Sequence, residues 1–331
     1  MRSLGFLAVL LALAPGLSAQ AWLFPKGDGT VTVLYQDNIE RLHSFSDGRA
    51  QDKGHTYFDA VVVNSDFSLT DRLALSVSLP YMDGKYVGTH PHLLVRGQAD
   101  TEVAIDNGSY HGGIQDFRLN VRYALTQHAL KIVPFFQATI PSHDYPSFGH
   151  AAIGFDEREY RAGASVGRRL NPILSNAFVQ GLYAFGYTPL VAANIAPKRS
   201  YGELQLGYLV NRRLSVQASS SLVYSHNGID LDYNLFPGNL TEEQYLNHDR
   251  IGRSKLLDIS GSAAYQINKS TNFFVSVGHS VYGRNTHLRY LVTTIGFTKA
   301  FTTRMSAEST SILEPLPDAN KAMVCTCSKS K

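Results

Sequence analysis

The stretch that decides the fold runs from Gly113 to Thr126 and reads GIQDFRLNVRYALT. Apolar and polar residues alternate along it, which predicts a β-strand with two unlike faces, because successive side chains of a strand point to opposite sides. The apolar face carries Phe117, Leu119, Val121, Tyr123 and Leu125, and the polar face carries Asp116, Arg118, Asn120, Arg122 and Ala124. In a soluble sandwich the apolar face is the core, whereas in a membrane barrel it meets lipid and the polar face lines the lumen. The stretch alone is compatible with both folds.

The first 21 residues have the features of a secretory signal peptide. Arg2 precedes an apolar run from Leu4 to Leu13, and Ala19–Ala21 has the small-x-small pattern of a cleavage site. The apolar run is shorter than the roughly 20 residues that a transmembrane helix needs. A buried N-terminal helix is the alternative interpretation. We expect residues 1–21 to be removed on export to the outer membrane.

Composition excludes several functions. The net charge of +3 gives no reason to expect a nucleic-acid partner. Aromatic residues make up 11 % of the chain and charged residues only 17 %, against about 25 % in typical soluble domains. The only cysteines, Cys325 and Cys327, lie at the C-terminus, so no disulfide framework is expected in the body of the chain. No phosphate-binding glycine loop or dinucleotide motif occurs, and we expect no cofactor.

Short polar turns alternate with mostly long loops along the chain. The short turns are expected at 69–72, 125–128, 170–172, 210–213 and 267–270, and the loops at 37–54, 83–110, 143–156, 188–199, 225–254 and 283–286. Twelve strands lie between them, at 30–36, 55–69, 73–82, 112–125, 129–141, 158–169, 173–187, 200–210, 213–224, 255–267, 271–282 and 288–301. Most reach the roughly 9–11 residues that a tilted strand needs to cross a bilayer. Because outer-membrane barrels sort short turns and long loops to opposite ends, the pattern favours an all-β, up-and-down antiparallel transmembrane β-barrel of about 12 strands.

The polar face of this barrel is expected to line its lumen. Charged side chains recur on that face in several strands, where acids and arginines can pair across neighbours. The candidate lumen-lining residues are Asp116, Arg118, Arg122, Glu159, Arg161, Glu203 and Asp258. In 129–141 and 173–187 both faces are apolar, which indicates either a segment that covers them inside the barrel or an apolar lining for a hydrophobic ligand.

The end of the last strand, Thr294–Phe301, resembles the C-terminal signal by which outer-membrane proteins are recognised by the barrel assembly machinery, although Lys299 departs from its pattern. We therefore divide the chain into a signal peptide (1–21), a barrel (22–301) and a C-terminal tail (302–331). The tail is either a periplasmic extension or carries a further strand near 304–313. The sequence therefore does not decide between a barrel of 12 strands and one of 14.

Several segments together resemble a known family. Ala21–Gly29, Phe67–Tyr81 and Gly112–Tyr123 are similar to the outer-membrane proteins of the meta-pathway phenol-degradation-like family, and so are Ile140–Ser142 and Glu159–Arg168. The resemblance covers most of 21–225. It implies an outer-membrane barrel that transports small hydrophobic compounds, and it assigns no functional residue.

Three functions follow as hypotheses. The first is a channel or transporter for small, hydrophobic or aromatic molecules, with outer-membrane lipid and an unidentified small-molecule ligand as partners. The second is a structural or adhesive barrel that acts through its loops. The third is a lipid hydrolase, for which Ser225–His226 and His279–Ser280 are the only candidate pairs, and neither has the expected spacing, so we expect no enzyme activity.

Seven histidines fall in or beside the expected long loops: His90, His92, His111, His143, His150, His226 and His248. His90 and His92 lie on one face of an extended loop and are compatible with a shared metal ion. No carboxylate partner is evident from the sequence. Solvated loop residues are the favoured interpretation, and we predict no metal site.

Overall fold

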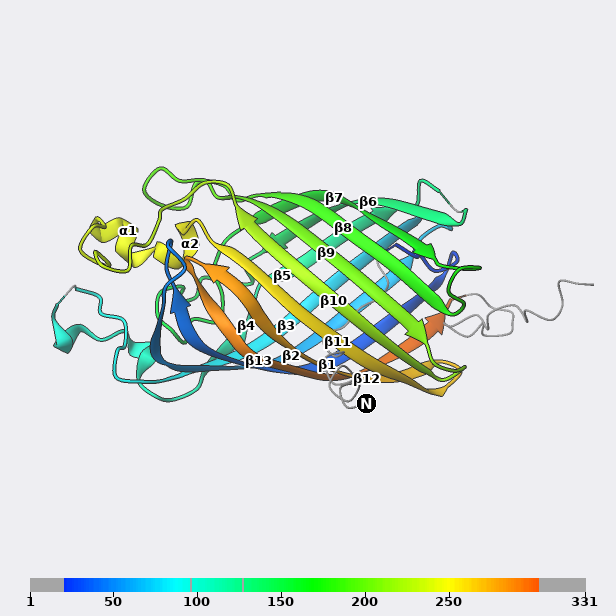
Figure 1. Ribbon diagram of the computed structural model, residues 1–331, viewed down its shortest axis with the longest axis horizontal. Helices are drawn as coiled ribbons and strands as arrows, with labels where there is room; N and C mark the ends of the chain where they lie inside the picture. The colour runs from blue at the N-terminus through cyan, green and yellow to red at the C-terminus, as the bar shows by residue number, and fades with distance from the viewer. Residues whose placement is uncertain (1–20, 96, 127, 304–331) are drawn as a thin grey trace, which may run out of the picture.

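The computed structural model describes residues 21–95, 97–126 and 128–303. In these residues a single antiparallel sheet of thirteen strand segments closes on itself, because β13 pairs with β1, β1 with β2, and β2 with β3. The segments are β1 (Asp28–Ser44), β2 (Ala50–Ser68), β3 (Leu73–Val87), β4 (His111–Ile114), β5 (Phe117–Tyr123), β6 (Leu130–Ile140), β7 (Glu159–Arg169), β8 (Ala177–Tyr187), β9 (Lys198–Leu209), β10 (Leu214–Ser225), β11 (Lys255–Asn268), β12 (Thr271–Arg284) and β13 (Thr286–Thr302). Since β4 and β5 follow each other along β3, they act as one strand. The prediction of a 12-stranded antiparallel barrel is confirmed (Figure 1).

The strand expected over 112–125 is broken by a bulge. β3 pairs Tyr81 with Ile114 but Ser78 with Arg118, so the β4–β5 side carries one residue more than β3. The break lies opposite Pro80, which has no N–H for the ladder. The extra residue reverses the alternation. Ile114 is exposed on the outer wall, whereas Asp116 is buried inside.

The short turns lie together at one end of the barrel, as predicted. They are stabilised by their own side chains: Thr70 Oγ1 accepts from the backbone N–H of Leu73 at 2.9 Å, and Asn211 Oδ1 accepts from Leu214 N–H at 2.9 Å. This is the turn chemistry that Thr and Asn supply. The expected strand over 173–187 begins only at Ala177, because 170–176 form one of these turns.

The other end carries the long loops 88–110, 141–158, 188–197 and 226–254 (Figure 1). They contain the 3-10 helices η1 (Ala99–Thr101) and η2 (Ala104–Asp106) and the helices α1 (Glu242–Leu246) and α2 (His248–Ile251). No helix in the described residues is long and apolar enough to span a membrane.

The predictions of loops at 37–54 and 283–286 were wrong, because the structure has mostly strand there. Most of 37–54 is strand, since β1 and β2 stay paired out to Ser44 and Ala50. Between β12 and β13 only Asn285 remains of the loop expected at 283–286. Strand ends that rise above a membrane meet water on both faces, so they need no apolar alternation and resemble loops in the sequence.

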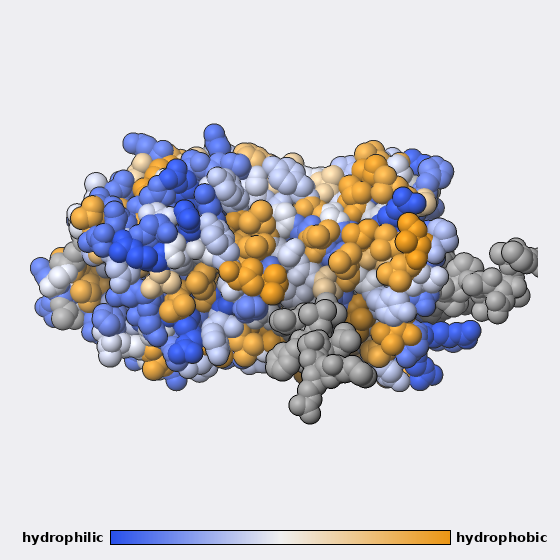
Figure 2. All heavy atoms as spheres, in the orientation of Figure 1, coloured by the Kyte–Doolittle hydropathy of each residue, from blue (hydrophilic) through white to orange (hydrophobic). Residues whose placement is uncertain are grey.

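The outer wall of the barrel is apolar. Leu119, Val121 and Tyr123, the apolar row of the opening stretch, are exposed by 44, 42 and 43 %. Their counterparts on other strands are exposed too: Val33, Val61, Leu79, Phe136, Tyr183, Leu204, Leu206, Val275, Ile295 and Phe297. Figure 2 shows hydrophobic side chains gathered over the strands and mainly hydrophilic ones at the long-loop end. Such a wall suits contact with lipid rather than with water.

The long loops form a small core of their own. Phe45, Leu231, Leu240 and Tyr245 are buried together, with Phe236 packed against them. Phe45 follows β1, while the others come from the loop between β10 and β11. We call the loops that meet around this core the cap.

Candidate functional site

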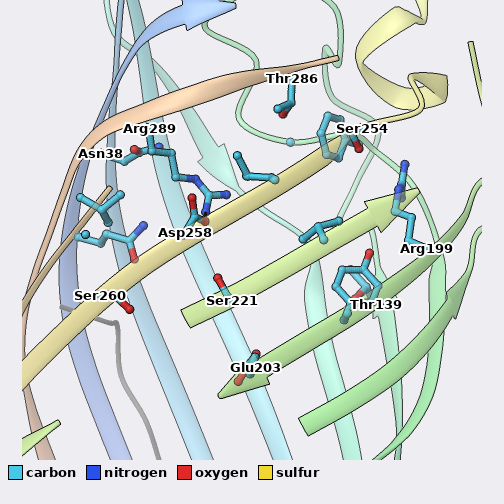
Figure 3. A pocket seen from close by; sticks show the side chains of 18 of the residues that line it. Asn38, Thr139, Arg199, Glu203, Ser221, Ser254, Asp258, Ser260, Thr286 and Arg289 are labelled. Carbon is cyan, nitrogen blue, oxygen red and sulfur yellow. Dashed lines mark hydrogen bonds and ion pairs between the residues drawn. The ribbon is translucent and has the colours of Figure 1, made fainter. Parts of the chain in front are cut away.

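A polar cavity of about 580 Å3 lies inside the barrel. Residues from strands on all sides of the barrel line this cavity. Figure 3 shows side chains from β1, β6, β9, β11 and β13 pointing into it. Neutral polar residues alternate with charged ones on this wall. The neutral group includes Gln36, Asn38, Thr139, Gln205, Ser219, Ser221 and Ser260.

Six of the seven candidate residues border this cavity: Asp116, Arg118, Glu159, Arg161, Glu203 and Asp258. The structure does not bring Arg122 to it. Arg122 is 2 % exposed and forms a buried ion pair with Asp66 of β2. Its side chain shares the inner face of β5 with Arg118 but lies closer to the short-turn end, with Asn120 between the two.

Glu159 is the centre of the charged network on one side of the cavity. It pairs with Arg161 and, at 3.2 Å, with Arg199 Nη1 of β9. The Tyr201 hydroxyl donates to Glu159 Oε2 at 2.6 Å, and the Arg161 guanidinium lies 3.6 Å from the centre of the Tyr201 ring. Glu159 is thus held by three donors, and such charge-assisted bonds fix a buried carboxylate in place.

A second charged group lies across the cavity. Arg289 Nη1 of β13 donates to Asp258 Oδ2 at 2.6 Å, and the Ser280 hydroxyl donates to the other carboxylate oxygen at 2.7 Å. In Figure 3 Arg289 reaches over to Asp258, while Arg199 lies on the far side. Charges of both signs therefore occupy opposite walls of one chamber.

Arg118 differs from the other arginines of the wall. It is exposed to the cavity, and no carboxylate of the described residues lies within 4.0 Å of its guanidinium. Its neighbour Asp116 accepts a hydrogen bond from the Tyr145 hydroxyl at 2.5 Å instead. Burial, followed by this bond, raises the pKa of Tyr145. Arg118 is therefore the cation on this wall with the most freedom to meet a solute.

The cavity wall is joined to the cap through Glu157. Its carboxylate lies 3.5 Å from Arg199 Nη1 and 3.4 Å from Nε of Arg250 in α2. Arg199 also donates to the backbone oxygen of Arg250 at 2.9 Å. Burial raises the pKa of Glu157 to about 7, against the opposing effect of the two arginines. This contact holds α2 over the long-loop end of the cavity.

The first described residues enter the barrel at the short-turn end. Ala21 is 1 % exposed, and its N–H donates to Gln180 Oε1 at 3.1 Å. Trp22 packs edge-on against Phe178 of β8, with ring centroids 5.7 Å apart. A Cβ at Gly167 would lie 2.6 Å from that of Ala21, so the approach needs glycine there. Trp22 therefore covers the inner face of β8 at its short-turn end, beside Phe178.

Arg199 and Arg289 are two arginines of the wall that the sequence analysis did not single out. Arg199 falls at the end of an expected loop. Arg289 faces inward because β13 gains a residue opposite Ile39 and Glu40, which reverses the alternation set by 292–301. A bulge of this kind leaves no signal in the polar pattern.

The candidate hydrolase pairs are not formed. Ser225 Oγ bonds to Ser254 Oγ, and Ser280 donates to Asp258. His226 Nε2 instead lies 2.8 Å from the hydroxyl of Ser200, which also contacts the Tyr183 hydroxyl.

A closed antiparallel sheet with an apolar outer wall and a polar interior is the architecture of outer-membrane β-barrels. No protein-family model matches the chain, and no curated protein matches it significantly in sequence. An outer membrane channel from Pseudomonas putida F1 has the same fold, with a TM-score of 0.65 at 12 % identity over 87 % of this chain and 100 % of the channel. The NanC porin gives 0.47 at 9 % identity, covering 82 % of this chain and 98 % of the porin, and the CymD monoaromatic hydrocarbon channel gives 0.41 at 12 %, covering 84 and 90 %. The chain therefore has the fold of an outer-membrane barrel, and the family resemblance drawn from the sequence stays a prediction.

Proposed function

We propose that the protein is a channel of the outer membrane that passes small molecules through the barrel. One observation carries the proposal: an apolar, exposed outer wall surrounds a charged inner chamber of about 580 Å3. In outer-membrane barrels an apolar wall faces lipid and a polar interior forms the channel of the porins.

The wall suits solutes that combine apolar surface with a negative charge. Arg118 offers a cation without a close carboxylate partner in the described residues, and Phe155 and Val292 add apolar surface to the same chamber. Small aromatic or hydrophobic molecules with an acidic group have this character. They would approach from the long-loop end, past α2 and the cap.

Conductance in planar bilayers tests the proposal, with Arg118→Ala as the variant. Loss of a cation from the wall is expected to shift ion selectivity toward cations, because Arg118 raises the local anion concentration. The matched control is Arg168→Ala, which removes an exposed arginine from the same barrel outside the cavity. An open-pore signal whose selectivity is the same in both variants and the natural protein would remove Arg118 from the pathway. The absence of any conductance or solute uptake would overturn the channel.

A lipid hydrolase has one observation in its favour, the contact between Ser200 and His226. The pair lies beside the exposed Tyr183 on the outer wall, as a nucleophile and base for a lipid substrate would. In the described residues no group orients the second ring nitrogen of His226, so the pair lacks the third member of a catalytic triad there. Phospholipid hydrolysis by the purified protein that disappears in Ser200→Ala would favour this function over the channel.

A further inference from the structure

Five histidines and two aspartates meet under the cap at the long-loop end of the barrel. They come from five separate parts of the chain and were not recognised as a group in the sequence. The members are His43, His92, His150, His248, His287, Asp106 and Asp249. Of the pair considered from the sequence, His92 belongs to the group, while His90 is exposed and its Nδ1 contacts Thr89.

Within this group, His43, His248 and Asp249 have their ligand atoms within 4.8 Å of one another. His248 Nε2 lies 3.5 Å from Asp249 Oδ1. Ligand atoms around a tetrahedral zinc ion with bonds of about 2.0–2.1 Å are separated by roughly 3.3 Å. Small side-chain rotations are therefore enough to bring the three atoms onto one ion.

His248 is prepared as a ligand by its other ring nitrogen. Nδ1 lies 2.7 Å from the backbone oxygen of Tyr245, and this bond requires the proton on Nδ1. The lone pair is then on Nε2, which faces Asp249. A backbone carbonyl that fixes the tautomer is the usual outer partner of a metal-binding histidine.

His43 supplies independent evidence of a ligand. Its side chain is almost fully buried, yet neither ring nitrogen has a hydrogen-bond partner among the described residues. Buried polar groups are nearly always hydrogen-bonded, and a buried polar group without a partner points to a bound water or ion. Since the ring lies beside the other members of the group, an ion there would satisfy it.

His287 lies beside these three residues and is the candidate for a fourth ligand. Its Nε2 lies 3.7 Å from Asp249 Oδ1, and its ring centroid is 4.7 Å from that of His43. Three imidazoles and one carboxylate match the nitrogen and oxygen ligands of zinc. Calcium and magnesium prefer oxygen ligands, so this set disfavours them.

The neighbouring triad of His92, Asp106 and His150 is less suited to a metal. Asp106 Oδ2 accepts from the N–H of His92 at 2.9 Å, and Oδ1 accepts from the N–H of Ala151 at 3.0 Å. His150 Nε2 lies 3.1 Å from the backbone oxygen of His90. This carboxylate already ties two loops together, so its role is structural.

We propose that His43, His248 and Asp249, with His287 as the fourth ligand, bind one Zn2+ ion that fastens the cap to the barrel. His43 lies at the end of β1 and His287 at the start of β13, whereas His248 and Asp249 lie in α2. The ion would therefore link two barrel strands to the helix above the cavity. It would sit between the inner cavity, which reaches Asp249, and an outer cavity of about 440 Å3 bordered by His43 and His248.

Zn2+ titration of the purified, folded full-length protein by calorimetry tests the site. The protein carries Cys325→Ser and Cys327→Ser, so that the terminal thiols cannot bind the ion. One Zn2+ per chain is expected, with affinity lowered on the order of 100-fold in both His248→Gln and Asp249→Asn. His143→Gln, an exposed loop histidine outside the group, is the matched control and should bind like the parent. Heat-modifiable migration on gels shows that each variant retains its barrel.

Co2+ in place of Zn2+ adds a spectroscopic readout, since a tetrahedral nitrogen and oxygen site gives intense visible bands that His248→Gln should abolish. Zn2+ binding that survives both His248→Gln and Asp249→Asn overturns the proposal. The proposal is also overturned if His92→Gln abolishes Zn2+ binding while His248→Gln and Asp249→Asn do not, or if the protein takes up no Zn2+ at all. None of these outcomes depends on whether solutes pass through the barrel, so the zinc site and the channel can fail separately.

Discussion

The two ends of the barrel are stabilised in different ways. At the short-turn end, the turns are stabilised by single side chains such as Thr70 and Asn211, and a fully buried ion pair, Arg122–Asp66, joins β5 to β2. At the long-loop end, segments far apart in the sequence pack around Phe45 and Leu231. The barrel thus rests on continuous strand pairing and the cap on side-chain contacts. Regions with few paired strands open at a lower free energy, so we expect the cap to open locally while the barrel stays folded.

The largest effect is expected from Arg122→Ala at the short-turn end. The change leaves the Asp66 carboxylate buried beside strands that exclude water. Removing one partner of a buried pair destabilises by about 3–5 kcal/mol. Equilibrium unfolding in urea, from detergent or lipid, measures it.

The comparison between the ends supplies the control. Arg253 and Asp230 form a pair at the long-loop end whose side chains are 45 and 43 % exposed. Arg253→Ala should change the free energy of unfolding by less than about 1 kcal/mol. Replacing both Arg122 and Asp66 by Leu should restore much of the lost stability. Equal losses from Arg122→Ala and Arg253→Ala would contradict the assignment of a buried pair.

Leu231→Ala should affect the cap alone. Leu231 is 1 % exposed, and truncation of a buried leucine costs about 2–5 kcal/mol. Because the strands do not depend on this contact, we expect faster proteolysis within 226–254 while heat-modifiable migration of the barrel stays unchanged. Leu235→Ala, at a site 57 % exposed in the same loop, is the control. Loss of the folded barrel in Leu231→Ala would show that the cap and the barrel are one cooperative unit.

Glu157, which joins the two regions, should make stability depend on pH. Its pKa is raised from the usual 4.5 to about 7, so between these values the folded state keeps a proton that the unfolded state has lost. Stability therefore falls as pH rises through this window, by up to about 1.4 kcal/mol per pH unit for one proton. Glu157→Gln should flatten the profile between pH 4.5 and 7, measured by urea unfolding across that range. A slope that is the same in both proteins would show that Glu157 ionises normally.

The sequence predicted the barrel well and the cap poorly, for a physical reason. The rows that include Leu119 and Val121 alternate because one face forms the exposed apolar wall and the other faces the polar interior, so strand positions and short turns can be predicted from the local pattern. The contacts that build the cap, such as Phe45 with Leu240, join segments about 200 residues apart and have no local signature.

The same limit applies to the cavity. Glu159 and Arg161 were expected on the inner face from alternation and do border the cavity, but Arg199, which pairs with Glu159, was not foreseen. Arg289 was missed because a bulge reverses the faces of β13. The histidines of the proposed zinc site come from the ends of two strands and from the helix α2. Loop spacing in the sequence gives no information about which of them meet.

The smallest effect is expected from Thr241→Ala, which tests how the cap helix α1 begins. Thr241 Oγ1 accepts from Gln244 N–H at 3.2 Å, and Gln244 Oε1 accepts from Thr241 N–H at 3.0 Å, which is a capping box. Loss of the hydroxyl should cost about 1 kcal/mol, and only locally, because Thr241 and the first residues of the helix are exposed and the barrel does not contact this bond. Hydrogen exchange at the Gln244 amide should therefore accelerate about fivefold, while amides of β9 and β10 stay protected. Thr241→Ser keeps the acceptor and should exchange like the natural protein. Acceleration that spreads to the strands in Thr241→Ala would mean that the two ends of the barrel are not stabilised separately, and the contrast between them would fail.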